Sequence, residues 1–181
     1  MASLTETPRV PAALITGDWQ VTDVGSDVSF VTRILFGLIP VRGRFTAPSG
    51  ELHVDADGRA RGELRLDAEK ISTGIKKRDR HLRSSDFFAV DEHRHLKFEL
   101  ASLDISAEGA LRVTGSLCVR DQAIAIDTPV RVEQMGTTGL RVSAEFLVDH
   151  RASGLSSIGP GWKKVPRALN AHVALALIPT D

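Results

Sequence analysis

The sequence predicts an all-β protein: an extended antiparallel barrel of about eight strands, interrupted by one short helical insert. Three observations predict it. From Trp19 onward most segments alternate apolar and polar residues, which is the period of a strand with one buried face. Glycine-containing turns separate these segments at hairpin spacing. No long amphipathic helix is available to cover the apolar faces, so the sheet must pair with a second sheet or close on itself, and a barrel is the simplest closure.

The alternating segments follow one another along the chain. In order they are "DVSFVTRILF" (27–36), "RGELRLDAE" (61–69), "LKFEL" (96–100), "LRVTGSLCVR" (111–120), "AIAIDTPVRV" (123–132) and "LRVSAEFLV" (140–148). The last expected strand, "ALNAHVALALI" (168–178), is apolar on both faces. The turns "DADGRA" (55–60), "SAEGAL" (106–111) and "QMGTTGL" (134–140) each carry a glycine where a hairpin would reverse.

A barrel of about eight strands can enclose one small ligand, and its inward face must be the apolar one. We therefore expect a set of apolar side chains from the strands, the insert and the rim to contact a ligand. They are Val28, Phe30, Ile34, Phe36, Phe45, Leu64, Leu66, Leu82, Phe87, Phe88, Phe98, Leu100, Leu117, Val119, Ile124, Ile126, Phe146 and Trp162.

The stretch "STGIKKRDRHLRSSDFFAV" (72–90) breaks the alternation and predicts a short helix and turn at about residues 74–88. Thr73 is the expected N-cap. Leu82, Phe87 and Phe88 are expected to face the barrel, with the Lys/Arg row in solvent. A nucleic-acid patch is the weaker interpretation of this row, because acidic residues accompany it and the whole chain has 23 basic and 23 acidic side chains.

Composition narrows the class of protein further. The 181 residues predict one domain over 17–181, preceded by a flexible arm over 1–16. The single cysteine, Cys118, excludes an intrachain disulfide framework. No apolar run reaches the ~20 residues of a membrane-spanning helix, and the N-terminus lacks the pattern of a secretory signal. We expect a cytoplasmic protein without stable membrane insertion.

The insert and its flanks resemble the YceI-like family of lipocalin-like proteins. That family shows Thr, then Arg-Asp-x-His-Leu, then Asp-Phe-Phe, and the chain matches it at Thr73, Arg78, Asp79, His81, Leu82, Asp86, Phe87 and Phe88. Three further elements are similar: Val-x-Gly-x-Phe at Val41, Gly43 and Phe45, Gly-x-Leu at Gly115 and Leu117, and Arg-x-x-Gly at Arg151 and Gly154. The resemblance covers about residues 17–178. Arg120-Asp121 stands where many members have Arg-Gly.

This resemblance implies a long apolar cavity that holds a polyisoprenoid, an isoprenoid quinone or a similar lipid. It also implies that the insert is a lid or side wall, and that the polar motif positions Thr73, Arg78, Asp79, His81 and Arg151 are structural or contact a head group. Many members of the family are exported, and this chain lacks the signal. No cofactor is required by this interpretation, although a bound isoprenoid-type lipid is expected.

Three functions follow from these observations. The first is a carrier or sequestering protein for a long apolar ligand, and the second is an enzyme acting on a hydrophobic substrate in the same cavity, with His81 or an inward carboxylate as base. The third is an interaction protein whose barrel is filled by side chains. His93 and His95 share a strand face, but a third metal ligand is not evident, so no metal site is expected.

The last expected strand adds a hypothesis about association. Val173, Leu175 and Leu177 lie on one of its faces, and Ala174, Ala176 and Ile178 lie on the other. A barrel needs only one apolar face per strand, so the outward face would form an exposed apolar strip. Such a strip favours a homodimer contact.

Overall fold

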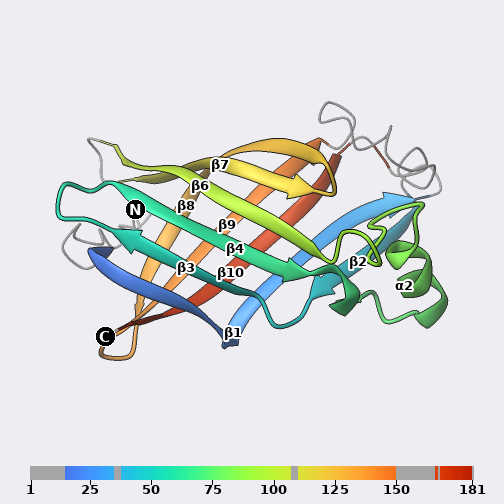
Figure 1. The fold of residues 1–181 in the computed structure, drawn as a ribbon, viewed down its shortest axis with the longest axis horizontal. Helices are drawn as coiled ribbons and strands as arrows, with labels where there is room; N and C mark the ends of the chain where they lie inside the picture. Colours follow the sequence, from blue (N-terminus) through green and yellow to red (C-terminus); the bar gives the residue numbers. More distant parts are fainter. Residues whose placement is uncertain (1–14, 35–37, 107–109, 150–165, 167, 181) are drawn as a thin grey trace, which may run out of the picture.

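In the computed structural model the chain is described over residues 15–34, 38–106, 110–149, 166 and 168–180. The described residues form one antiparallel sheet that carries a single α-helix of more than one turn (Figure 1). Its strands are β1 Gly17–Ile34, β2 Ile39–Phe45, β3 Ser49–Val54, β4 Ala60–Asp67, β5 Ile71–Ser72, β6 His95–Ile105, β7 Leu111–Val119, β8 Gln122–Met135, β9 Gly139–Asp149 and β10 Ala168–Pro179.

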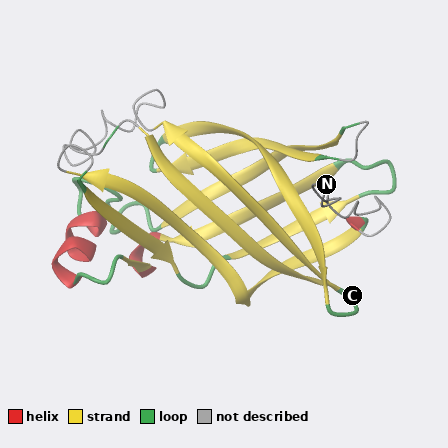
Figure 2. Ribbon diagram, turned by 180° about the vertical axis from the view of Figure 1, so that it is seen from behind, coloured by secondary structure: helices red, strands yellow, loops and turns green. Residues whose placement is uncertain are grey.

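The sheet closes because its first and last long strands pair: β10 bonds to β1 as well as to β9. The ten labelled segments occupy eight positions around the barrel. β2 and β3 lie end to end along β1, whose residues 28–34 pair with β2 and whose residues 17–20 pair with β3. β5 and β4 lie end to end in the same way beside them. The predicted eight-stranded antiparallel barrel is confirmed (Figure 2).

Two short interruptions produce the end-to-end segments. Between β2 and β3 the backbone turns through Ala47, which has a φ of 54°. Between β4 and β5 the residues Ala68–Lys70 form one 3-10 turn, in which the Asp67 carboxylate caps the N–H of Glu69. Because β5 is only two residues long, the chain leaves the wall at this point and can form the insert.

The insert forms a short helix, α2 (Lys76–Arg83), followed by turns, as predicted for about residues 74–88. The predicted N-cap is wrong: the capping position is Ile75, which offers no side-chain hydrogen bond, and Thr73 has another role described below. The segment 84–93 continues as a series of turns stabilised by backbone hydrogen bonds such as Phe88 N to the carbonyl of Leu82. No helix among the described residues is long and apolar enough to cross a membrane.

The outer face of β10 differs from the expected exposed strip. Ala174 and Ala176 are buried, and the bulge of β1 between Thr22 and Asp27 lies against Ala176, where a Cβ on Gly25 would stand 3.5 Å from that of Ala176. Ser26 Oγ in this bulge accepts a hydrogen bond of 2.9 Å from the N–H of Ala176. The expectation of an exposed strip is therefore wrong except at its end, where Ile178 is exposed. The homodimer therefore stays a prediction, and the exposed apolar strip no longer supports it.

Two apolar clusters occupy the two ends of the barrel. One lies toward the insert and includes Phe45, Ile71, Phe87 and Phe88. The other lies at the opposite end and consists of Ile15, Trp19, Val54, Leu111, Val132, Leu140 and Leu177. Trp19 donates its indole N–H to the carbonyl of Ile15 at 2.9 Å, so at least one residue of the predicted 1–16 arm is buried against the barrel. Residues 1–14 lie outside the described part of the chain.

Candidate functional site

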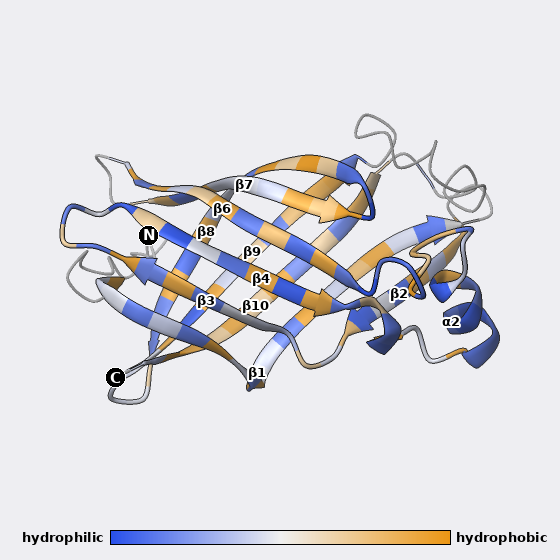
Figure 3. Ribbon diagram, in the orientation of Figure 1, coloured by the Kyte–Doolittle hydropathy of each residue, from blue (hydrophilic) through white to orange (hydrophobic). Residues whose placement is uncertain are grey.

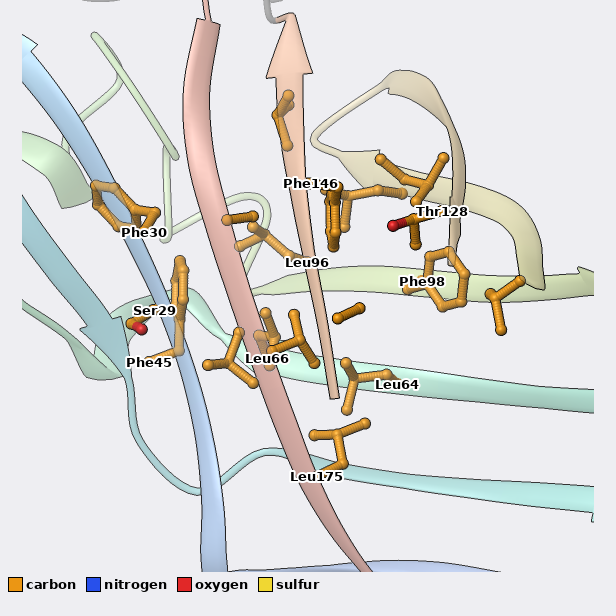
Figure 4. Close-up of a pocket in the computed structure, with 18 of the residues that line it drawn as sticks. Ser29, Phe30, Phe45, Leu64, Leu66, Leu96, Phe98, Thr128, Phe146 and Leu175 are labelled. Carbon is orange, nitrogen blue, oxygen red and sulfur yellow. The ribbon is translucent and has the colours of Figure 1, made fainter. Parts of the chain in front are cut away.

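A cavity with a volume of about 480 Å³ runs through the barrel, within the range that binds small organic ligands. Its wall is almost entirely apolar, and in Figure 4 side chains such as Phe98 of β6, Phe146 of β9 and Leu175 of β10 converge on the same space. Along β10 the lining extends from Leu169 to Leu177, roughly 26 Å of strand. A sphere of this volume would be only about 10 Å across, so the cavity is elongated along the barrel.

Fifteen of the eighteen side chains expected to contact a ligand line this cavity. They are Val28, Phe30, Phe45, Leu64, Leu66, Leu82, Phe87, Phe88, Phe98, Leu100, Leu117, Val119, Ile124, Ile126 and Phe146. Phe36 and Trp162 lie outside the described residues, as does the side chain of Ile34. The motif residue Arg151 also lies outside them. For the strands that carry these fifteen residues, the inward face is the one that alternation predicts.

The cavity is also lined by residues outside the set that the sequence predicts to contact a ligand. The odd-numbered side chains of β10 also line the cavity, as do Leu96, Val142 and Val148. β10 was missed because both of its faces are apolar, so alternation cannot say which one is inward. Thr128 was missed as well: it is a buried polar residue on the cavity wall, and its hydroxyl donates to the carbonyl of Pro129 at 3.2 Å.

Two glycines of the motif elements shape the lumen. Gly43 lies opposite Phe30 on the neighbouring strand, and a Cβ on Gly43 would stand 2.3 Å from the ring carbon Cζ of Phe30. A Cβ on Gly115 would stand 2.4 Å from Cζ of Phe98. Each phenylalanine ring therefore packs against the wall over a glycine. Without the glycine the ring would have to move.

The two phenylalanines of the insert are buried and connect it to the barrel. Phe88 meets Phe45 in an edge-on contact with ring centroids 6.0 Å apart, and Phe45 meets Phe30 at 6.2 Å. Phe87 contacts the His81 ring edge-on at 5.2 Å. A continuous aromatic series thus extends from the insert into the cavity wall, as expected of a lid or side wall.

Thr73 holds the first turn of α2 through two neighbouring motif residues. Its N–H donates to Asp79 Oδ1 at 2.8 Å, and its hydroxyl also donates to Asp79. The Arg78 guanidinium donates to Thr73 Oγ1 at 2.8 Å and to the Thr73 carbonyl at 2.9 Å. Asp79 is buried, so its charge is stabilised by these donors rather than by water. Arg78 is thereby held with part of its side chain on the cavity wall.

His81 and Arg120 fix the other side of the insert. His81 Nε2 lies 2.9 Å from Asp86 Oδ2, and His81 also lines the cavity, so this position is compatible with both of the roles that the resemblance implies. Arg120, in the β7–β8 turn with a φ of 54°, donates to the carbonyls of Ser85 and Phe87 at 3.1 and 3.3 Å. No sequence signal indicated this contact, because Arg120 and the insert are more than 30 residues apart.

Several charges of the barrel wall form ion pairs. Lys97 bonds to Glu63 at 2.9 Å and to Glu99 at 2.8 Å. The hydrogen bond from Lys97 is the largest influence on Glu63 and holds the pKa of that carboxyl below its usual value. Glu63 is therefore a paired carboxylate, and its residue also borders the cavity. His93, expected as one of a pair, approaches Asp121 at 3.8 Å.

These features define an antiparallel barrel with an elongated apolar cavity and a helical insert fastened to one end. The chain belongs to the family of YceI-like domains, whose model matches residues 19–175. That match confirms the family that the motif residues indicate.

Curated relatives are similar over part of their length. A UPF0312 protein of Ectopseudomonas mendocina is 31% identical over 77 residues, which cover 41% of this chain and 40% of the relative. A UPF0312 protein of Shewanella denitrificans is 28% identical over 113 residues, which cover 60% of this chain and 58% of the relative. The matches thus span about half the length of these relatives.

Solved structures show the same fold at lower sequence identity. BcnA of Burkholderia cenocepacia aligns with a TM-score of 0.73 at 18% identity, over 86% of this chain and 98% of that one. A polyisoprenoid binding domain from Saccharophagus degradans aligns with a TM-score of 0.72 at 17% identity, over 90% of this chain and 98% of the other.

Proposed function

We propose that this protein binds a long apolar ligand of the polyisoprenoid or isoprenoid quinone type lengthwise in its barrel, as a carrier or sequestering protein. The observation that carries the proposal is the shape and chemistry of the cavity: elongated, about 480 Å³, and lined by aliphatic and aromatic side chains. Burial of such a ligand is favoured by ~25 cal/mol per Å² of apolar surface removed from water. The similar domain from Saccharophagus degradans is itself named for a ligand of this class, which supports the proposal.

The orientation of the ligand follows from where polar groups meet the cavity. Arg78 and His81 of α2 are cationic or ionisable side chains on a wall that is otherwise almost entirely apolar. An oxygen-bearing head group would find a cationic hydrogen-bond donor there, whereas the other polar residues of the lining are hydroxyl-bearing or acidic, such as Thr32, Thr128 and Glu51. We infer that the head group lies at the insert and the apolar tail extends toward Leu140 and Leu177. Thr73 and Asp79 then act as positioning residues for Arg78.

A lumen-blocking variant tests the proposal. Ala171 lines the cavity between Phe30 and Phe146, its partners on the two neighbouring strands. Ala171→Phe should obstruct the lumen, whereas the matched change Ala125→Phe adds the same ring to an exposed position on β8. Purified proteins are extracted for mass spectrometry, and delipidated samples are titrated with an all-trans octaprenyl alcohol.

We expect the Ala171→Phe protein to lose most of its extracted lipid and to bind octaprenyl alcohol at least tenfold more weakly than the Ala125→Phe protein. Comparison is made at equal folded fraction, by circular dichroism. Equal binding by both variants would refute binding in the lumen. The same extraction separates carriage from catalysis, because a carrier returns its ligand chemically unchanged after incubation.

A further inference from the structure

The exposed face of α2 concentrates cations that have no acidic partner in the described part of the chain. Lys76, Lys77 and Arg80 are exposed, and within the described residues none has a carboxylate within 4 Å. Several cations of the barrel wall are in the opposite situation: Arg94 and Lys97, for example, each contact two carboxylates. Three such cations within five residues form a local positive surface on a molecule whose formal net charge is zero.

Exposed apolar side chains lie at the same end of the barrel. Ile75, directly before α2, is 52% exposed. Leu38 and Ile39, at the start of β2, are 80% and 44% exposed. The end of β1, the start of β2 and α2 lie together at one end of the long axis, and α2 is the strongly hydrophilic element there (Figures 1 and 3). We call the six residues Leu38, Ile39, Ile75, Lys76, Lys77 and Arg80 the insert-end surface.

We propose that the insert-end surface docks the protein on a bilayer that contains anionic phospholipid. Basic side chains are attracted to the negative potential of such a membrane, and neighbouring aliphatic side chains can enter its interface. A nucleic acid would use the same cations but gains little from Leu38, Ile39 and Ile75, and no exposed aromatic ring is among the six. Among the acidic side chains of the insert, Asp86 pairs with His81, and the exposed Asp91 and Glu92 follow α2 in the chain and are not among the six residues.

Docking at this end would place the lid, rather than the far end of the barrel, against the membrane. Phe87 and Phe88 of the insert lie on the cavity wall. The purpose of docking, exchange of an apolar ligand with the bilayer, rests on the proposed function. The docking itself does not, because binding to vesicles is measured without reference to the cavity.

The test uses sedimentation of the full chain with vesicles of phosphatidylcholine containing 30 mol% phosphatidylglycerol, and with pure phosphatidylcholine vesicles. The variant K76Q/K77Q/R80Q removes three cations while keeping good helix formers. The matched control, R59Q/R61Q/R131Q, removes three other exposed cations that lie away from α2 and have no carboxylate within 4 Å among the described residues. A separate variant, Ile75→Ser, removes one apolar side chain of the surface.

We expect the protein to bind the anionic vesicles and to bind them less as salt is raised. The K76Q/K77Q/R80Q variant should lose roughly 100-fold in partition coefficient, at a few-fold per cation, and the control should lose much less. Ile75→Ser should lose a few-fold. All variants should retain the extracted lipid of the parent, which separates failure of docking from failure of lipid binding.

Three outcomes would overturn the proposal: no binding of the parent to anionic vesicles, an equal loss in the control variant, or equal binding to neutral and anionic vesicles. Binding of a 20-mer oligonucleotide that depends on Lys76, Lys77 and Arg80, with no vesicle binding, would assign the same cations to a nucleic acid instead.

Discussion

The glycine at position 43 decides how much room the lumen has beside Phe30. Its missing side chain lets the Phe30 ring pack against the wall, and the ring then contacts Phe45 and so the insert. Glycine has a low intrinsic preference for strands and lowers their stability. Its presence at position 43 is therefore explained by the close packing of Phe30. Gly43 and Gly115 each leave the space that a phenylalanine ring occupies, that of Phe30 and that of Phe98 respectively.

We expect Gly43→Ala to destabilise the fold by about 1–3 kcal/mol, because the new Cβ must displace an aromatic ring in a packed wall. It should also lower lipid content, since the ring can move only toward the lumen. Urea unfolding and lipid extraction measure the two effects. Adding Phe30→Leu to the variant should recover part of the stability. A Gly43→Ala protein as stable as the parent would contradict this account.

Thr73 is the residue on which the start of α2 depends. Thr73→Val keeps the shape of the side chain but removes the hydroxyl that joins Asp79 and Arg78. We expect a loss of about 1–3 kcal/mol in the local stability of the insert, because buried Asp79 loses a donor. Hydrogen exchange of residues 76–83 should become faster while that of the barrel strands stays unchanged. Ser72→Ala, at the exposed neighbouring position, should change little.

The segment after α2 attaches the insert to the barrel through burial and hydrogen bonds together. Phe87 and Phe88 fill the wall, while Arg120 of the β7–β8 turn binds the backbone beside them. The exposed cations of α2 contribute nothing comparable to this attachment, because they lie in solvent. The insert is therefore attached through its apolar side, and its basic side is available for other contacts.

Replacing both insert phenylalanines by alanine should reduce lipid retention far more than replacing Lys76 and Lys77 by alanine. Removal of a packed phenylalanine typically costs about 3–5 kcal/mol, whereas an exposed lysine costs less than about 0.5 kcal/mol. Lipid content per folded protein is the measurement, with folding checked by circular dichroism. Equal lipid content in the two variants would show that the insert is only a connector.

At the scale of the whole molecule the two ends of the barrel differ. The insert end has charged and exposed residues, while the opposite end is filled by Trp19 and its apolar neighbours. We expect this cluster to limit the length of the ligand that the cavity accepts. Trp19 lies in the cluster that includes Leu140 and Leu177, two residues of the lining.

Trp19→Ala should therefore extend the lumen and shift preference toward longer chains. We expect it to cost about 3–5 kcal/mol of stability as well, since a large buried side chain is lost. Competition between geranylgeraniol and octaprenyl alcohol for the delipidated protein measures the preference. Leu66→Ala in β4 serves as the comparison, because it also removes apolar volume from the wall but belongs to the cluster toward the insert. An unchanged chain-length preference in Trp19→Ala would show that Trp19 does not limit the length of the ligand.

Much of the fold could be predicted because strand alternation is a local property. Leu64 with Leu66, and Ile124 with Ile126, face inward as their two-residue spacing requires. The position of the insert was evident from the loss of that period, and the family from its motif. The start of α2 was not evident, because it is set by tertiary contacts such as those of Thr73 rather than by a capping side chain.

The amino-acid sequence by itself determined the class of the fold, the inward face of each strand with one polar face, and the apolar chemistry of the lumen. Only the tertiary structure decided which face of β10 is inward, that the β1 bulge lies against Ala176, and that Arg120 binds the insert. The physical reason is the range of the interactions. Alternation acts between neighbours in the chain, whereas these contacts depend on the register that ring closure imposes on strands far apart in sequence.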